Sequence, residues 1–477
     1  MSTPRSKITA DLVSTLGSRL QNTKVVTETS PDYGECIARW SDTAVKRAGV
    51  VLFPSTAQDI SIVVKFVQEH NIDLAVKCGG HSVSGTSSSD GGIVIDLGRM
   101  RGVTVDAATK VITAQGGALW ADVDNAAAEY GLATVGGTVN HTGIGGLTLG
   151  GGYGWLSGRY GMVVDNLLSA NLVLADGSVV TASSTENPDL FWAVRGAGHG
   201  FGIAVEFQYR CYEQKGEVFS GLLTFTPDKL ELVLDFLNSL SEELDANTAA
   251  VFMLGQPPGA LVPIVAVAPI YIGPEEEARN KFKPLFALGP ELDKTYMMPY
   301  VKLNALFADM TAYGGRKTFK GTFFLKPVRP AFVRSILDNF TTKLQSDSDL
   351  LGSAIVLEFM DMRKVCEVPL SSTAVANRSM NTLNGIVGLR WKESSNDAQH
   401  REYARQLQAL FKEELDSQLK ERNITPDGVP QYLNYAEPGD IAVPEIFGDN
   451  TTRLQKLKAQ YDPGCLFSKM LSITPVT

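Results

Sequence analysis

Two glycines followed by a histidine, in the segment KCGGHS (77–82), are the first residues of this sequence from which chemistry is expected. The segment follows a short β-rich run and turns at Gly79 and Gly80. Consecutive glycines at such a turn let main-chain N–H groups point outward together, and this arrangement binds anions such as a diphosphate. An isolated GGH is also compatible with a tight turn that carries a surface histidine, so the interpretation depends on the segments that follow.

Two further segments are rich in glycine. Residues 136–161 read GGTVNHTGIGGLTLGGGYGWLSGRYG, and residues 195–202 read RGAGHGFG. Each glycine adds to the backbone entropy lost on folding and packs no side chain, so this density disfavours regular structure. We therefore expect the longer segment to be a buried loop that wraps a ligand. For His141 within it we expect a loop histidine satisfied by backbone groups, with stacking near the ligand as the alternative.

Near the C-terminus, YLNY places Tyr432, Asn434 and Tyr435 within four residues. In a strand, alternation would put Tyr432 and Asn434 on one face and Tyr435 on the other. A phenol with an ordinary pKa near ~10 needs a nearby cation or hydrogen-bond donor to act as a base at neutral pH. Arg390, in the apolar strand GIVGLRW, is one candidate for that cation. The alternative is that Tyr435 packs at a domain interface and Arg390 pairs with a surface acid.

Other patterns are weaker or absent. Glu358, in VLEFMDM, is an ionisable group in an expected strand, and alternation alone allows it to face a cavity or solvent. No G-x-G-x-x-G or G-x-x-x-x-G-K-[ST] pattern occurs, which removes the usual sequence argument for a Rossmann site or a P-loop. GHSVSG misses the G-x-S-x-G nucleophile elbow because Ser84 replaces the second glycine. The five histidines are far apart and lack metal-ligand spacing, so we expect no metal.

The elements that position these segments follow from local patterns. Ser55 and Gln58 form a candidate capping box before a helix whose apolar face comprises Ile60, Val63, Val64 and Val67. In the first half we expect strands at 74–77 and 93–97, hairpins at 103–117 and 167–183, and helices at 119–131 and after Asn187.

From about Cys211 to Val429 the glycine-rich character ends and the composition becomes that of an ordinary α+β domain. Apolar strands are expected at 261–272, 353–362 and 385–391, and amphipathic helices at 226–244 and 397–419. The last part of the chain carries YLNY and a helix at 451–461, and we expect it to return to the first domain.

Composition limits the classes of function. A chain of 477 residues predicts two or three packed units, and its net charge of -9 disfavours nucleic acid as a partner. The longest apolar stretch, 260–272, is interrupted by prolines and is too short for a membrane span of ~20 residues. The opening residues lack a signal-peptide core, so we expect a cytoplasmic protein that does not enter a membrane, either a monomer or a homodimer. Five cysteines without a C-x-x-C pair are expected to be reduced.

Taken together, KCGGHS, the glycine segment 136–161 and RGAGHGFG resemble the FAD domain of the vanillyl-alcohol oxidase superfamily, and specifically its berberine-bridge-enzyme-like branch. YLNYAEPGD followed by KLKAQYDPGCLF resembles the closing segment of that family. The resemblance implies an α+β fold of two domains, an FAD-binding domain and an α/β substrate domain with an antiparallel sheet. It places the FAD-binding domain at 1–208, the substrate domain at 209–429, and a return to the FAD-binding domain at 430–477.

The resemblance implies FAD bonded covalently through the ring of His81. A tether of this kind prevents dissociation and raises the reduction potential of the flavin. Many members add a second bond through a cysteine, but this chain has Val139 at that position, so one bond is expected. Cys78 is expected to be small buried filler, although a bond to another flavin atom is the alternative. His199 is expected to contact the cofactor without chemistry. The residues assigned to cofactor binding are Lys77, Cys78, Gly79, Gly80, His81, Ser82, Val83, Gly85, Gly137, Val139, Thr142, Gly143, Gly145, Gly146, Leu149, Gly150, Gly151, Gly152, Tyr153, Gly154, Gly202, Ile203, Val205, Tyr432 and Asn434.

For the reaction, the resemblance assigns the general base to Tyr435, with Tyr432, Arg390 and Glu358 as further catalytic candidates. The expected function is an oxidase that takes hydride from a small organic alcohol or secondary-metabolite intermediate and passes electrons to oxygen, giving hydrogen peroxide. Thr142 lies where a compact side chain leaves oxygen a path to the flavin. The alternatives are a flavin-dependent dehydrogenase or redox-neutral cyclase on the same fold, and a catalytically silent flavin- or ligand-binding protein.

Overall fold

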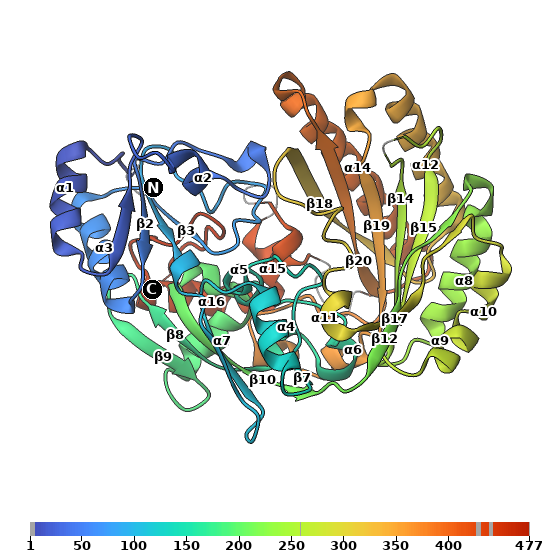
Figure 1. Cartoon of the computed structure of the whole chain (residues 1–477), viewed down its shortest axis with the longest axis horizontal. Coiled ribbons are helices and arrows are strands. Elements are labelled where there is room, and N and C mark those ends of the chain that lie inside the picture. Colours follow the sequence, from blue (N-terminus) through green and yellow to red (C-terminus); the bar gives the residue numbers. More distant parts are fainter. Residues whose placement is uncertain (1–4, 258, 426–430, 438–441, 477) are drawn as a thin grey trace.

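The computed structural model describes residues 5–257, 259–425, 431–437 and 442–476. Two lobes stand side by side, and both chain termini lie in the same lobe (Figure 1). We call that lobe, which contains all three glycine-rich segments, the glycine lobe, and the other the large-sheet lobe. Within the described residues, no helix is both long and apolar enough to cross a membrane.

The glycine lobe is built on two sheets. The first has the order β1 (Thr23–Val26), β2 (Val50–Pro54), β4 (Ile93–Asp96) and β3 (Leu74–Lys77), with β2, β4 and β3 parallel. The second is antiparallel, in the order β5 (Val103–Asp106), β6 (Val111–Gln115), β10 (Ile203–Arg210), β8 (Leu167–Val173) and β9 (Val179–Ser183). β11 (Tyr212–Glu213), which follows β10 in the chain, forms a short antiparallel pair with β7 (Leu132–Ala133).

Helices cover these sheets. α3 (Ala57–His70) packs against β2, β8 and β9 and also contacts α1 (Ala10–Arg19), and its face Ile60, Val63, Val64 and Val67 is fully buried, as the apolar spacing predicts. α4 (Trp120–Ala128) packs on β5 and β6, and α7 (Pro188–Ala197) on β8 and β9. The last helix, α16 (Thr451–Tyr461), lies against α7 in the glycine lobe.

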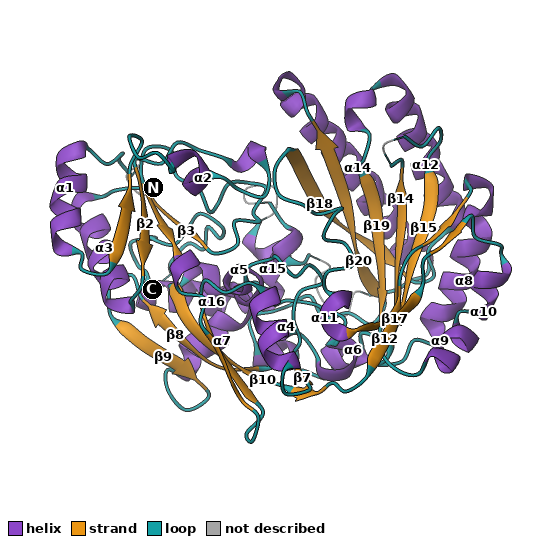
Figure 2. Ribbon diagram, in the orientation of Figure 1, coloured by secondary structure: helices purple, strands orange, loops and turns teal. Residues whose placement is uncertain are grey.

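The large-sheet lobe contains an antiparallel sheet with the order β16 (Leu292–Asp293), β13 (Leu223–Phe225), β15 (Ile264–Tyr271), β14 (Thr248–Gly255), β19 (Ala354–Met360), β20 (Thr382–Trp391) and β18 (Arg316–Leu325). β12 (Glu217–Ser220) and β17 (Tyr296–Pro299) pair beside β15. Helices gather on the outer side of this sheet (Figure 2): α8 (Leu230–Glu242) contacts β19, α12 (Pro330–Ser346) contacts α8, and α14 (Asp397–Glu421) contacts β18 and β20.

Strand alternation divides the two faces of the large sheet. In β19, Ile355, Leu357 and Phe359 belong to the core beneath the helices, whereas Ala354, Val356 and Glu358 line a cavity on the opposite face. Glu358 therefore faces the cavity and not solvent, and its side chain is buried. The shorter helices are α2 (Tyr33–Ile37), α5 (Ile144–Leu149), α6 (Ser157–Tyr160), α9 (Glu275–Lys281), α10 (Lys283–Ala287), α11 (Tyr300–Leu303), α13 (Arg363–Cys366) and α15 (Val443–Phe447).

Three local predictions are wrong in detail. The cap of α3 is Thr56, whose hydroxyl accepts from the Asp59 amide, one residue after the predicted Ser55 and Gln58 box. The shift has a tertiary cause, because the Asp59 carboxylate also accepts from the Asn22 amide and the Thr23 hydroxyl.

The second correction concerns the segment 136–161, which is not entirely loop, because α5 and α6 lie within it. Ile144, Thr148 and Leu149 of α5 are buried, and Gly145 lets the helix approach the Gly116 carbonyl closely, since an added Cβ would lie 3.0 Å from that oxygen. Packing of this short helix against the core thus overrides the low helix propensity of glycine.

The third correction concerns YLNY. Residues Leu433–Tyr435 form a 3-10 turn and not a strand. The predicted separation of Tyr432 from Tyr435 is therefore wrong: their rings meet edge to face, with centroids 4.9 Å apart. Leu433 is buried and holds the turn in the core.

Candidate active site between the glycine segments and the large sheet

A cavity of about 1500 Å³ lies where the two lobes meet. One wall comes from the three glycine-rich segments, and the other from β14, β15, β18, β19 and β20, with residues 432–437 between them. Pockets for single small ligands usually measure ~300 to 1000 Å³, so this cavity has room for a cofactor and a substrate together.

Glycine is required where the first two glycine segments touch. A Cβ on Gly79 would lie 2.4 Å from the Gly143 nitrogen, and a Cβ on Gly143 would lie 2.4 Å from the Cys78 sulfur. Gly80, with φ of 69°, turns the chain after β3 so that His81 reaches the cavity wall. The contact between the two segments therefore depends on residues without side chains.

The ring of His81 is held by aromatic neighbours. Trp40 stacks on it with centroids 5.2 Å apart and an interplanar angle of 15°, and His141 stacks with centroids 4.8 Å apart. Nε2 of His81 lies 2.8 Å from Nδ1 of His141. Burial, followed by His141 and Lys317, lowers the pKa of His81 to about 3, so the imidazole is neutral.

The prediction for His141 is incomplete, because its ring nitrogens also contact side chains, beside a hydrogen bond with the backbone of its own residue. Besides His81, its Nε2 lies 3.1 Å from Oγ1 of Thr311, which comes from the large-sheet lobe. The same stretch carries Tyr313, whose hydroxyl donates to the carbonyl of Gly79 at 2.6 Å. The stretch before β18 thus folds over the GGH turn.

Cys78 lines the cavity and donates weakly to the carbonyl of Ala118, with the two atoms 3.4 Å apart. Burial raises the pKa of the Cys78 thiol to about 11. Because the thiolate is the reactive form of cysteine, this thiol is unreactive at neutral pH.

On the opposite wall, Tyr435 and Glu358 form a buried pair. The Tyr435 hydroxyl donates to Oε1 of Glu358 at 3.1 Å. Burial raises the pKa of Glu358 to about 7, and burial together with Glu358 raises the pKa of Tyr435 well above 10. At neutral pH the carboxylate is accordingly the stronger base of the two, and the phenol is its hydrogen-bond donor.

Asn434 ties this turn to the glycine lobe. Its Nδ2 donates to the Tyr432 hydroxyl at 2.8 Å and to the Leu147 carbonyl at 2.9 Å. Gly150 makes this approach possible, since a Cβ there would lie 2.0 Å from Oδ1 of Asn434. The two tyrosines are therefore positioned directly against the second glycine segment.

Arg390 also lines the cavity, and its Nη1 donates to the carbonyl of Met310 at 3.0 Å. The hydroxyl of Tyr435 pairs with Glu358 instead. A second cation, Lys317, lines the cavity from the neighbouring strand β18, where it pairs in register with Arg390.

Most residues predicted from the sequence meet at this cavity. The lining includes all four catalytic candidates, Tyr435, Tyr432, Arg390 and Glu358, and the cofactor candidates Cys78, Gly79, Gly80, His81, Ser82, Val83, Val139, Thr142, Gly143, Gly145, Gly146, Leu149, Tyr153, Gly202, Ile203 and Asn434, with His199 beside them. The remaining candidates lie behind this wall and do not line it: Lys77, Gly85, Gly137, Gly150, Gly151, Gly152, Gly154 and Val205.

These residues behind the wall have structural partners. Lys77 forms an ion pair with Asp96, with the charged atoms 2.7 Å apart. A Cβ on Gly154 would lie 1.7 Å from the Gly136 carbonyl oxygen, and one on Gly152 would lie 2.6 Å from Leu147 and Val163. Gly152 and Gly154 therefore allow parts of the second glycine segment to pack closely against neighbouring backbone and side chains.

Comparison with known proteins agrees with this geometry. The family described as FAD binding domain matches residues 48–183, and the family described as Berberine and berberine like matches residues 431–474. The FAD-linked oxidoreductase pgmH of Aspergillus terreus is 36% identical over 461 residues, 93% of this chain and 92% of that protein. This chain belongs to the berberine-bridge-enzyme-like family of FAD-linked oxidoreductases.

Two further relatives are oxidases by name. (R)-6-hydroxynicotine oxidase of Paenarthrobacter nicotinovorans is 29% identical over 447 residues, 91% of this chain and 93% of that protein. The crystal structure of 6-hydroxy-D-nicotine oxidase from Arthrobacter nicotinovorans superposes with a TM-score of 0.82 at 25% identity and covers 98% of this chain and 100% of that chain. The fold is the two-domain α+β fold of the vanillyl-alcohol oxidase superfamily.

The residues of this berberine-bridge-enzyme-like protein fit FAD. The contact of Gly79 with Gly143 leaves a cradle without side chains beside His81, where a dinucleotide can approach the backbone. Several buried polar atoms of the cavity lining, among them Nδ1 of His199 and Nε1 of Trp155, have no hydrogen-bond partner among the described residues. Buried polar atoms are normally paired, so these atoms indicate a polar ligand.

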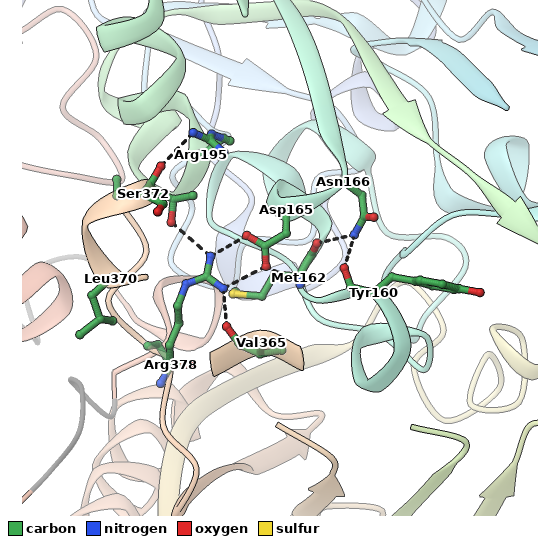
Figure 3. A network of polar contacts seen from close by, with 12 residues as sticks. Tyr160, Met162, Asp165, Asn166, Arg195, Val365, Leu370, Ser372 and Arg378 are labelled. Atoms are coloured by element: carbon green, nitrogen blue, oxygen red, sulfur yellow. Dashed lines mark hydrogen bonds and ion pairs between the residues drawn. The ribbon is translucent and has the colours of Figure 1, made fainter. Parts of the chain in front are cut away.

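A buried ion pair that no sequence pattern predicts joins the glycine lobe to the large-sheet lobe. Figure 3 shows Arg378, from the stretch before β20, pointing at Asp165, which follows α6. The guanidinium donates to both carboxylate oxygens, at 2.9 and 2.7 Å, and to the carbonyl of Val365 at 2.8 Å. Both side chains are almost fully buried.

Sequence reasoning also missed Trp40, Thr311, Tyr313 and Lys317. Lys317 is buried, and its ammonium lies 4.1 Å from the centroid of the Trp40 ring and donates to the Trp40 carbonyl at 2.9 Å. One signal was present in the sequence: Lys317 and Lys320 lie just before the apolar run Phe323–Leu325 of the same strand. Lys320 pairs with Glu437, with the charged atoms 2.6 Å apart, and so fixes the end of the YLNY turn.

Proposed function

We propose that this protein is an FAD-dependent oxidase that removes hydride from the alcohol carbon of a small, largely apolar substrate and passes the electrons to oxygen, giving hydrogen peroxide. The observation that carries the proposal is the buried Tyr435–Glu358 pair, which faces the glycine cradle across the cavity. Bound FAD supplies the hydride acceptor. The chain's own residues supply the base.

The pair acts as a proton relay. A substrate hydroxyl donates its proton to the Tyr435 oxygen while the Tyr435 proton moves to the Glu358 carboxylate. Tyr435 alone is a poor base because its pKa is raised well above 10, whereas the pKa of Glu358, about 7, suits a base at neutral pH. The role assigned to Tyr435 from the sequence is thus shared with Glu358.

We propose a single covalent bond between FAD and His81. The neutral imidazole of His81 is nucleophilic, and its Nε2 is engaged by His141, which leaves Nδ1 for the bond. Cys78 is protonated and Val139 carries no thiol, so neither side chain competes.

The walls of the cavity favour an apolar or aromatic alcohol over a sugar. On the substrate side, Val251, Met253, Ile264, Val356 and Ile386 form an apolar patch. A sugar buried there would leave several hydroxyl groups without partners, and each would cost about 1 to 3 kcal/mol.

For oxygen access, Thr142 lines the cavity beside Gly143 and has nearly the volume of valine. We propose that this compact side chain leaves oxygen a path to the cofactor.

We also propose that the domains divide as the resemblance implies, at 1–208, 209–429 and 430–477. Strand membership supports a first boundary slightly later, because β10 continues to Arg210 and β11 at Tyr212–Glu213 still pairs with β7.

A substrate panel tests the function. The full-length flavoprotein is mixed without oxygen with apolar aryl and alkyl alcohols, their amine analogues and oligosaccharides, and bleaching of the flavin absorbance is followed. Bleaching by an apolar alcohol, with one peroxide formed per alcohol oxidised after air is admitted, supports the proposal. Bleaching by amines or sugars only overturns the substrate class, and bleaching without peroxide identifies a dehydrogenase.

A further inference from the structure

The contacts of His141 fix which nitrogen of each histidine carries a proton. The Thr311 hydroxyl has one hydrogen and lies 2.7 Å from the Phe307 carbonyl oxygen, which can only accept. The Thr311 oxygen therefore accepts from Nε2–H of His141, 3.1 Å away. Burial, followed by Lys317, lowers the pKa of His141 and so favours the neutral ring, in which Nδ1 carries the lone pair when Nε2 carries the hydrogen.

The same logic extends to His81. Nδ1 of His141 accepts from Nε2–H of His81 across 2.8 Å, so the lone pair of His81 is on Nδ1. Hydrogen positions in this chain are assigned from the donors and acceptors that surround each ring. A chain of hydrogen bonds runs from His81 through His141 and Thr311 to the Phe307 carbonyl. This chain selects the tautomer of His81 that carries its hydrogen on Nε2.

We propose that His141, oriented by Thr311, is the positioning residue for covalent attachment of FAD at His81: it holds the tautomer with a nucleophilic Nδ1 and takes the Nε2 proton as the bond forms. The inference rests on the proposed attachment at His81 and adds the residue that drives it.

The chemistry balances with oxygen as the oxidant. One C–H bond of the flavin 8α methyl group and the N–H bond of His81 break, and a C–N bond forms at Nδ1. The two hydrogens and two electrons released end in hydrogen peroxide. His141 holds the His81 proton in between, and its Thr311 contact persists because Nε2–H is unchanged.

The surrounding residues suit this role. Trp40 stacks on the His81 ring, His141 meets the ring at Nε2, and Tyr313 meets it edge to face with centroids 5.3 Å apart. The ring therefore has little freedom to turn. Since Tyr313 also donates to the Gly79 carbonyl, the stretch that carries Thr311 is anchored to the GGH turn itself.

The test measures attachment and not turnover. The full chain is produced in a riboflavin-limited host, FAD is added, and the fraction of flavin that stays with acid-precipitated protein is followed over time. Three variants separate the roles: His141→Ala removes the ring, His141→Gln keeps an acceptor for Nε2–H that cannot take the proton, and Thr311→Val removes the acceptor that orients His141. Thr311→Ser is the matched control.

We expect attachment to slow by ~100-fold or more in His141→Ala and His141→Gln, as for loss of a general base. Thr311→Val should slow it less, and Thr311→Ser should match the parent. Added imidazole should restore attachment in His141→Ala and should leave the rate in Thr311→Ser unchanged. Non-covalent FAD binding should be retained in every variant.

Two outcomes contradict the inference. If the attachment rate in His141→Gln stays within a few-fold of the parent, no proton acceptor is needed at this position. If imidazole does not restore attachment in His141→Ala, His141 contributes only packing. If His81→Ala itself retains acid-stable flavin, the proposed attachment site fails, and that result is distinct from either of these.

Discussion

Replacing Glu358 with glutamine removes the group that we expect to hold the substrate proton. Glutamine keeps the size of the side chain and an oxygen that can accept from Tyr435, but it cannot be protonated in the relevant pH range. Because Glu358 is buried with the Tyr435 hydroxyl 3.1 Å away, the change isolates the acid–base role of the carboxylate.

The expected size follows from the pKa of Glu358, about 7. In the parent, the ionised fraction falls from about one half at pH 7 to about one hundredth at pH 5, so flavin reduction should slow by roughly 50-fold over that range. In Glu358→Gln the rate at pH 8 should fall by ~100- to 10,000-fold, and the pH dependence should disappear.

The same substitution, which should slow flavin reduction, should raise the stability of the folded protein at pH 8. The folded pKa of about 7 lies above the ordinary 4.5, so the folded protein binds the proton more tightly, and stability declines as pH rises from 4.5 to 7. Above pH 7 the buried carboxylate lowers the free energy of unfolding by about 3 kcal/mol. Glu358→Gln should therefore unfold at a higher temperature than the parent at pH 8, with the difference vanishing near pH 4.5.

Stopped-flow measurement of anaerobic flavin reduction between pH 5 and 9, together with thermal unfolding at pH 4.5 and 8, provides both readouts. A Glu358→Gln variant that reduces flavin within a few-fold of the parent and keeps its pH profile refutes the relay. A variant that is slow but no more stable at pH 8 refutes the argument from burial.

Three further predictions concern the tether, the phenol and the lobe contact. His81→Ala should release its flavin on acid precipitation, whereas flavin that stays with the peptide would place the bond elsewhere. Tyr435→Phe removes only the hydroxyl and should slow flavin reduction by ~100-fold or more with substrate binding intact; a change of a few-fold would leave Glu358 as the sole base. Arg378→Met leaves Asp165 buried without its charged partner and should lower stability by about 3 to 5 kcal/mol, which chemical denaturation measures; a loss below about 1 kcal/mol would mean that Asp165 is solvated.

The parts of the fold that the sequence predicts are those fixed by local patterns. β3 at Leu74–Lys77 and α16 at Thr451–Tyr461 have the predicted bounds, because a glycine pair ends one and a proline follows the other closely. The hairpin at Asp176-Gly177 is confirmed, since Gly177 takes a positive φ of 79° and the Asp176 carboxylate accepts from the Ser178 amide in the turn.

What the sequence does not predict depends on contacts between distant residues. Thr311 and Tyr313 reach His141 and Gly79 from the other lobe, and no spacing rule links positions so far apart. The 3-10 turn of YLNY follows from the burial of Leu433 and from the contact of Asn434 with Leu147, which are tertiary contacts that strand alternation does not predict. The side-chain partners of His141 were not predicted because they lie in other parts of the chain.

The most direct test of the account is the reaction of the reduced protein with oxygen. The full-length holoprotein is photoreduced without oxygen, mixed with oxygenated buffer in a stopped-flow instrument, and the return of flavin absorbance is followed alongside peroxide formation. The account predicts reoxidation much faster than that of free reduced flavin, one peroxide per flavin, and a marked slowing in Thr142→Leu. Reoxidation no faster than that of free flavin would contradict the assignment as an oxidase.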